Sequence, residues 1–189
     1  QDQDTRQLLT RAINALFLAD SIGQAMQQGF AFFNQWDLTN GCAKNRTCYD
    51  LLVDGKKWRR SPQYFVFPLW AAFGNDLLPA TSSAAAASGF GVYAGRIDAD
   101  TVALLVVNKT ADPADVAVTL ASGASVVDGT IDVAAARKLK AKRMKLNADG
   151  NPADDLADAP SSPILSIGTT VSHRFPPYSI TLLRMNIAA

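Results

Sequence analysis

The chain of 189 residues is 48% hydrophobic and 19% charged, and its formal net charge is only +1. This composition is typical of a globular protein, and the near-zero charge does not favour a nucleic acid or an anionic membrane as partner. No apolar run approaches the roughly 18 residues that a membrane-spanning helix needs. All 17 acidic residues are aspartates and there is a single histidine, so the usual general acids and bases are scarce. We expect no catalytic residue, cofactor or metal on this chain.

The N-terminal region predicts a helix followed by a buried strand. From Thr5 to Gln28, apolar residues recur at helical spacing and make the centre apolar nearly all round. Gly29 suits the C-terminal cap, because glycine readily adopts the left-handed conformation required there. The apolar run Phe30–Trp36 follows at once, and predicts a strand covered on both faces, as in an α/β sheet.

The end of this predicted strand is the candidate substrate-binding site. In α/β folds, ligands meet the carboxyl ends of such strands, where Asn34, Trp36 and Asp37 would lie. A Trp ring can pack on the C–H face of a sugar while amides and a carboxylate bind its hydroxyls. The alternative is a core strand with a buried Trp, and spacing alone does not separate the two.

A long loop from Asp37 to Ser61 follows. It contains Cys42 and Cys48, for which a local disulfide is the favoured reading, because no further metal ligands lie nearby in the sequence. A disulfide indicates an exported protein, so we expect a secreted, extracellular location. The basic cluster Lys56–Arg60 is interpreted as a solvated face in preference to a ligand site. Asn45 and Asn108 begin matches to the glycosylation sequon, a pattern that is frequent by chance.

A second helix and a linker complete the first part of the chain. Ser61 and Pro62 suit the start of an aromatic helix that runs to about Asn75, with a kink at Pro68. The composition of residues 79–88, rich in Ala and Ser, predicts a linker. Residues 1–78 and 89–189 would then be separate units.

After the linker the apolar period changes from that of a helix to that of a strand. Many short strands separated by turn signals predict an antiparallel β-sandwich, which would dominate the fold. The segment 147–163 reads as a long loop, and Ala134–Arg137 is ambiguous. The predicted strands are Gly91–Ile97, Thr101–Asn108, Asp115–Leu120, Ser125–Val127, Leu139–Leu146, Ile164–Ile167, Thr170–Phe175 and Tyr178–Ile187.

This order of elements resembles the C-terminal end of clan A glycoside hydrolases, whose (β/α)8 barrel is followed by a β-sandwich. Members include the family 44 endoglucanases and xyloglucanases and the enzymes of families 51 and 39. By this resemblance, residues 1–78 are the last helix–strand–helix portion of the barrel and residues 89–189 the sandwich. The segments that carry the resemblance are Ala15–Asp20, Asn34–Leu38, Ser61–Phe65, Ala103–Lys109 and Pro176–Leu183.

The resemblance implies a retaining polysaccharide hydrolase whose two catalytic glutamates lie on barrel strands four and seven. This sequence has no glutamate. The resemblance therefore assigns no catalytic residue to this chain. It implies a role for Trp36 alone, whose ring would stack on a sugar ring of the substrate. The partners it implies are a polysaccharide or oligosaccharide and the remainder of the barrel, with neither nucleic acid nor membrane.

Two alternatives of other classes remain. One is a non-catalytic carbohydrate-binding or structural module. The tail has few aromatic residues, which argues against a glycan-binding face. The other is a stand-alone enzyme that uses Asp20, Asp37 and Asp50, which the sequence does not pair. His173 is interpreted as a surface or satisfied histidine.

Overall fold

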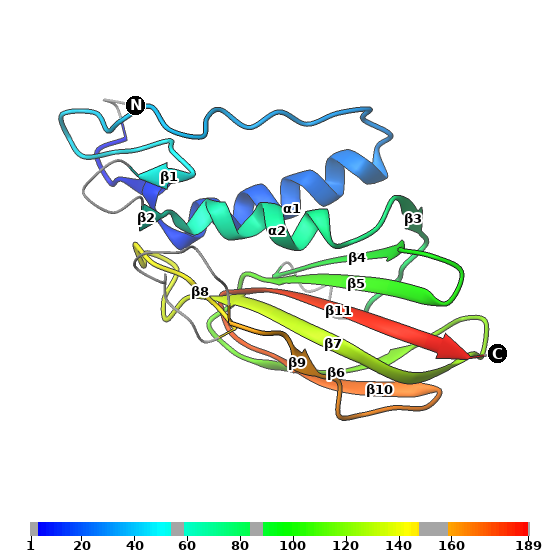
Figure 1. The fold of residues 1–189 in the computed structure, drawn as a ribbon. Coiled ribbons are helices and arrows are strands. Elements are labelled where there is room, and N and C mark those ends of the chain that lie inside the picture. The colour runs from blue at the N-terminus through cyan, green and yellow to red at the C-terminus, as the bar shows by residue number, and fades with distance from the viewer. Residues whose placement is uncertain (1–3, 54–58, 84–88, 148–158, 189) are drawn as a thin grey trace.

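A computed structural model describes residues 4–53, 59–83, 89–147 and 159–188. Figure 1 shows three layers: a pair of helices, a large antiparallel sheet beneath them, and a small sheet on its far face. The predicted linker lies outside the described residues from position 84 to 88, as does most of the predicted loop 147–163.

The first helix begins later than the sequence suggested. A 3-10 turn, η1 (Leu8–Thr10), precedes α1 (Ala12–Gln27), because Arg11 between them has extended backbone. The free N–H groups of Ala12 and Ile13 donate to the carbonyls of Ala141 and Leu139. Gly29 ends the helix as predicted, with φ at +76°.

The aromatic helix is shorter than predicted and changes its pitch before Pro68. A 3-10 segment, η2 (Pro62–Phe65), leads into α2 (Val66–Ala71). The helix stops short of Asn75, because Gly74 takes φ +100° and turns the chain toward the large sheet.

The large sheet contains seven strands, all paired antiparallel. Its order is β3-β4-β5-β11-β7-β8, with β9 also paired to β7. Its strands are β3 (Asp76–Leu78), β4 (Phe90–Arg96), β5 (Thr101–Asn108), β7 (Ser125–Ala135), β8 (Lys145–Leu146), β9 (Ser162–Pro163) and β11 (Ser179–Ala188).

A small sheet of two strands, β6 (Ala114–Thr119) and β10 (Thr170–Phe175), covers part of the large one. The apolar residues between the sheets include Val171 and Phe175 of β10 and Leu183 of β11. The predicted antiparallel sandwich is therefore confirmed. Two further short strands, β1 (Leu52–Val53) and β2 (Arg59–Arg60), pair with each other in the loop before η2.

The large sheet is buried on both faces, which explains the unbroken apolar run in β5. Ala103, Leu105 and Val107 pack in the core beneath the helices. Their neighbours on β5, Val102, Leu104 and Val106, pack between the two sheets. Two separate cores thus share one strand, in agreement with the rule that continuous apolar strands are covered twice.

The predicted packing of the sandwich on the aromatic helix is also confirmed. The Trp70 ring on α2 lies 5.5 Å, centroid to centroid, from the Tyr93 ring on β4. The indole N–H of Trp70 donates to the Ala19 carbonyl of α1 at 3.2 Å. Gly23 on α1 permits this approach, because a Cβ there would collide with the Tyr93 ring.

One predicted strand is wrong: residues 30–36 lie outside every helix and strand. The segment leaves α1 and runs back along it on the side away from the sheets (Figure 1). Phe30, Phe32 and Trp36 are 68%, 77% and 71% exposed. A strand buried on both faces needs strands to pair with, and the described residues place none beside this segment.

Two predicted strands of the tail differ widely in extent from the observed ones, and a third, Ile164–Ile167, is wrong. The strand predicted at 125–127 is the long β7, which also includes the ambiguous Ala134. Only Lys145 and Leu146 of the segment 139–146 are strand, since Leu139, Ala141 and Met144 instead anchor a loop to the helix-side core. Residues 164–167 follow the short β9 as irregular chain.

Candidate substrate-binding site

The three predicted sugar-binding residues lie together on the exposed segment that runs back along α1. Asn34 and Trp36 are exposed and Asp37 is half-buried. The peptide bond between Trp36 and Asp37 is cis. The carbonyls of Asp37 and Leu38 accept the N–H groups of Leu51 and Leu52, at 3.1 and 2.9 Å. The backbone on the C-terminal side of Trp36 is thereby held, while its ring faces open space.

The predicted disulfide between Cys42 and Cys48 is present. It closes a ring in which the Thr47 N–H donates to Asn45 Oδ1 at 2.9 Å. The ring is tied to the N-terminal segment, because Gln7 Nε2 donates to the Asn45 carbonyl at 2.6 Å. The disulfide therefore closes the ring, and hydrogen bonds such as that from Gln7 hold the ring against the start of the chain.

The two sequons differ in their surroundings. Asn108 is fully buried at the end of β5, where its Nδ2 donates to the carbonyls of Asp112 and Pro176 at 2.9 and 2.8 Å. Asn108 thus closes a turn between strands and does not present its amide for modification. Asn45 is half-buried.

The expectation that Asp37 and Asp50 lie in unrelated places is wrong. Asp50 is fully buried, and its Oδ2 accepts the Gly41 N–H at 3.1 Å. Burial, and after it the negative charge of Asp37, raise the pKa of Asp50 above its usual value. Among the described residues, the Oδ1 atoms of Asp37 and Asp50 have no hydrogen-bond partner. Positions 13 apart in a loop carry no periodic signal, so the sequence did not reveal this pair.

Asp20 has a different role, in a buried network that joins α1 to the large sheet. It accepts hydrogen bonds from the Tyr93 hydroxyl at 2.7 Å and from Gln24 Nε2 at 2.8 Å. It also forms an ion pair with Lys109 at 2.8 Å. The network thus ties α1 to β4 and to Lys109, the residue after β5.

His173 is half-buried, and among the described residues its Nε2 has no hydrogen-bond partner, so its interpretation as a surface or satisfied histidine is wrong. Its ring packs edge-on against Phe175 on β10, 4.8 Å between centroids, and burial lowers its pKa below the usual value. Among the described residues, no group of three or more His, Cys or Asp side chains could hold a metal ion. Within that same part of the chain, no helix is long and apolar enough to cross a membrane.

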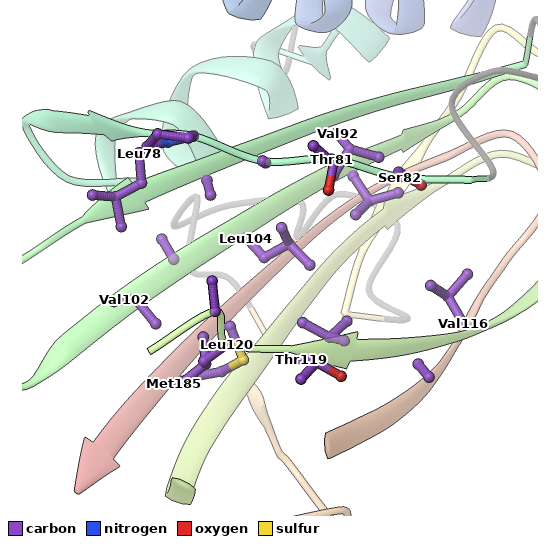
Figure 2. Close-up of a pocket in the computed structure, with 18 of the residues that line it drawn as sticks. Leu78, Thr81, Ser82, Val92, Val102, Leu104, Val116, Thr119, Leu120 and Met185 are labelled. Atoms are coloured by element: carbon purple, nitrogen blue, oxygen red, sulfur yellow. The ribbon is translucent and has the colours of Figure 1, made fainter. Parts of the chain in front are cut away.

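A cavity that Trp36 does not line lies between the two sheets. It has a volume of about 610 Å³ and is lined by β4, β5, β6 and the segment 78–83. Figure 2 shows Val92 and Leu104 from the large sheet, Val116 from the small sheet and Leu120, which follows β6, around it. This mainly aliphatic lining does not suit a glycan, whose hydroxyls need polar partners.

Comparisons with known proteins identify the fold. No family model matches the chain, and no curated protein matches it. An α-L-arabinofuranosidase from Thermotoga maritima, solved with arabinose, matches 93% of this chain with a TM-score of 0.65 and 16% identity. An arabinose-bound family 51 α-L-arabinofuranosidase matches 81% of it, with a TM-score of 0.60 and 18% identity. A family 30 subfamily 8 xylanase from Clostridium acetobutylicum matches 94% of it, with a TM-score of 0.56 and 14% identity.

The chain spans only 24% to 40% of the length of these three proteins. It has the fold of the C-terminal part of glycoside hydrolases, so the resemblance to the end of clan A enzymes is confirmed at the level of the fold. Family 51, which the sequence suggested, is among the matches, whereas family 30 was not foreseen.

Proposed function

We propose that this chain is the C-terminal portion of a retaining, polysaccharide-degrading glycoside hydrolase. The substrates we infer are β-glucan of the xyloglucan type or arabinose-containing plant polysaccharide. The rest of the barrel supplies both catalytic glutamates, and the sandwich supports the barrel. The fold supports this proposal, as do the enzymes to which the chain is similar, which include arabinofuranosidases and a xylanase.

The observation that carries the proposal is the exposed segment 30–38. The side chains of Phe30, Phe32, Phe33, Trp36 and Leu38 are between 43% and 77% exposed. A run of such residues on one segment is unusual for the surface of a soluble protein and indicates an interaction surface. Its order, apolar first and then Asn34, Trp36 and Asp37, suits a barrel strand that ends at a sugar site.

In the complete barrel the segment would pair with a strand on each side, which would cover its phenylalanines. Trp36 would then stand at the carboxyl end of the barrel, where its ring can pack on a sugar face. Asn34 and Asp37 would bind hydroxyl groups beside it. Retaining hydrolysis needs two carboxyl groups about 5 Å apart, and we assign neither to this chain. The disulfide supports a secreted location.

The rival binding module has less support. In the described part of the sandwich, Tyr93 and Phe175 are buried and Phe90 and Tyr178 partly buried. The exposed large hydrophobic residues there are the aliphatic Leu77, Val127, Leu165 and Ile167. A glycan-binding face depends on exposed rings, and these strands offer none in the described residues.

The test uses the longest protein that the encoding gene specifies. Upstream of Gln1 we expect barrel strands ending in glutamate, and hydrolysis of xyloglucan or of an aryl arabinofuranoside. Trp36→Ala should lower kcat/KM about tenfold or more, equivalent to ~1.4 kcal/mol. Leu165→Ala, at a side chain that is 90% exposed on the sandwich, is the control and should leave the kinetics unchanged. Wild-type kinetics for Trp36→Ala, or a gene without such strands, would contradict the proposal.

A further inference from the structure

A second surface, separate from the Trp36 segment, carries a concentration of positive charge. Residues 137–145, here called the basic loop, contain Arg137, Lys138, Lys140, Lys142, Arg143 and Lys145. No acidic residue occurs from position 133 to 146. Since the whole chain has a net charge of only +1, this loop is a strong local departure from the average.

The apolar residues of the basic loop hold it in place. Met144 is buried in the core beneath the helices, and Leu139 and Ala141 pack against the same core. The carbonyls of Leu139 and Ala141 accept the first N–H groups of α1, at 2.9 and 2.8 Å. The Lys140 carbonyl accepts a hydrogen bond from Arg11 Nη1 at 2.7 Å. The backbone of the loop is thus tied to α1 at three consecutive positions.

The cations point outward from this fixed backbone. All six basic side chains of the loop are exposed. Among the described residues, no carboxylate lies within ion-pair distance of the first five, Arg137 to Arg143. Burial, and after it the nearby charge of Arg143, lower the pKa of Arg59, the first residue of β2. The charge of Arg59 is therefore close enough to interact with Arg143 of the basic loop.

Like charges held close together repel one another, and an anionic ligand relieves this repulsion. We propose that the basic loop and Arg59 bind a carboxylate-bearing polysaccharide, such as a chain of uronic acids. This inference rests on the proposed function, which makes a glycan the natural partner. Lysine and arginine bind carboxylates through charge-assisted hydrogen bonds. The loop contains no aromatic residue on which a nucleic-acid base could stack, so single-stranded nucleic acid is the poorer fit.

The test measures binding of the full chain to polygalacturonate by calorimetry over a series of salt concentrations. The variant is the triple change Lys138→Gln, Lys140→Gln and Lys142→Gln. The control triple change, Arg6→Gln, Lys44→Gln and Arg46→Gln, alters the net charge equally at exposed residues elsewhere. Neutral dextran and duplex DNA serve as comparison ligands.

We expect polygalacturonate to bind with an affinity that falls as salt rises, and dextran not to bind. The loop variant should lose at least tenfold in affinity and lower the salt slope by about 2, whereas the control should change little. Equal losses in both triple variants, or tighter binding of DNA than of polygalacturonate, would overturn the inference. Because this assay needs no hydrolysis, its result is independent of the kinetic test of Trp36, and failure of this inference can be told apart from failure of the proposed function.

Discussion

Asp20 illustrates how one residue joins the helices to the sandwich. Its carboxylate lies on α1, yet its partners Tyr93 and Lys109 belong to β4 and the end of β5. Gly91 on β4 leaves room for it, because a Cβ at that position would collide with Asp20 Oδ1. The sequence showed only an aspartate within an apolar helix. Its pairing could not be predicted, because the partners lie 73 and 89 positions away.

Tyr93→Phe should destabilise the protein by about 1–2 kcal/mol, because it removes a buried hydroxyl that donates to a carboxylate. That hydroxyl lies 2.7 Å from Asp20 Oδ1. Urea unfolding of the wild type and the variant measures the difference. Tyr178→Phe, at a half-buried tyrosine, is the matched control and should stay within about 0.5 kcal/mol of the wild type. Equal stability of Tyr93→Phe and the wild type would show that the network contributes nothing.

His173 should make the stability depend on pH. Burial lowers its pKa in the folded state below the ordinary value of 6.5, so the unfolded chain binds the proton more tightly. The contribution of neutral His173 to the free energy of unfolding is therefore complete above pH 6.5. It decreases as the pH falls from 6.5 toward the pKa of the folded state. We expect a lower free energy of unfolding at about pH 5.5 than at about pH 7.5.

The variant His173→Phe keeps a ring against Phe175 but removes the titrating group. Its free energy of unfolding should change less between these two pH values than that of the wild type. The same decrease in the variant would assign the effect to other groups. Asp50 cannot explain a decrease in stability toward low pH. Its pKa is raised in the folded state, so its effect lowers the free energy of unfolding of the protein as the pH rises.

At the scale of elements, the sequence predicted the limits of a strand best where the apolar pattern of that strand is sufficient to define it. Thr101–Asn108 and Thr170–Phe175 were predicted with their observed limits. Asp128-Gly129 is a pair typical of turns, yet both residues lie inside β7, opposite Asn186 and Met185 of β11. A Cβ at position 129 would collide with the Arg184 carbonyl, so this glycine marks a close approach of two strands.

The segment 30–36 shows the opposite case. Its apolar run predicted a buried strand, but a strand depends on neighbours that a local pattern cannot supply. The candidate site shares this limitation. Asn34, Trp36 and Asp37 could be chosen from residue type and spacing, whereas the approach of Asp50 to Asp37 depends on the course of the loop between them.

Phe32→Ser should leave the stability of the 189-residue chain within about 0.5 kcal/mol of the wild type, because this side chain is already 77% exposed. The same change should reduce concentration-dependent self-association, measured by sedimentation velocity, since exposed apolar surface promotes association. Phe65→Ser, in the core, is the contrasting variant and should unfold far more readily. A large loss of stability in Phe32→Ser would mean that the segment is buried in solution.

At the scale of the whole molecule, we expect the 189-residue chain alone to have no glycosidase activity. A retaining mechanism needs two carboxyl groups with different pKa values across the scissile bond, and the chain has no glutamate. Incubation with xyloglucan, carboxymethyl-cellulose and aryl arabinofuranosides checks this expectation. Turnover that survives repurification and disappears in Asp37→Ala would contradict it, and would make the Asp37–Asp50 pair the first candidate for catalysis.

The strand β5, whose two faces belong to two cores, limits how such a protein can be recombined during evolution. A crossover near residue 80 would transfer the sandwich without α1 and α2. The transplanted sheet would then present Ala103, Leu105 and Val107 to water. A viable exchange must therefore carry the helices along with the strands, so the inherited unit is the three-layer assembly.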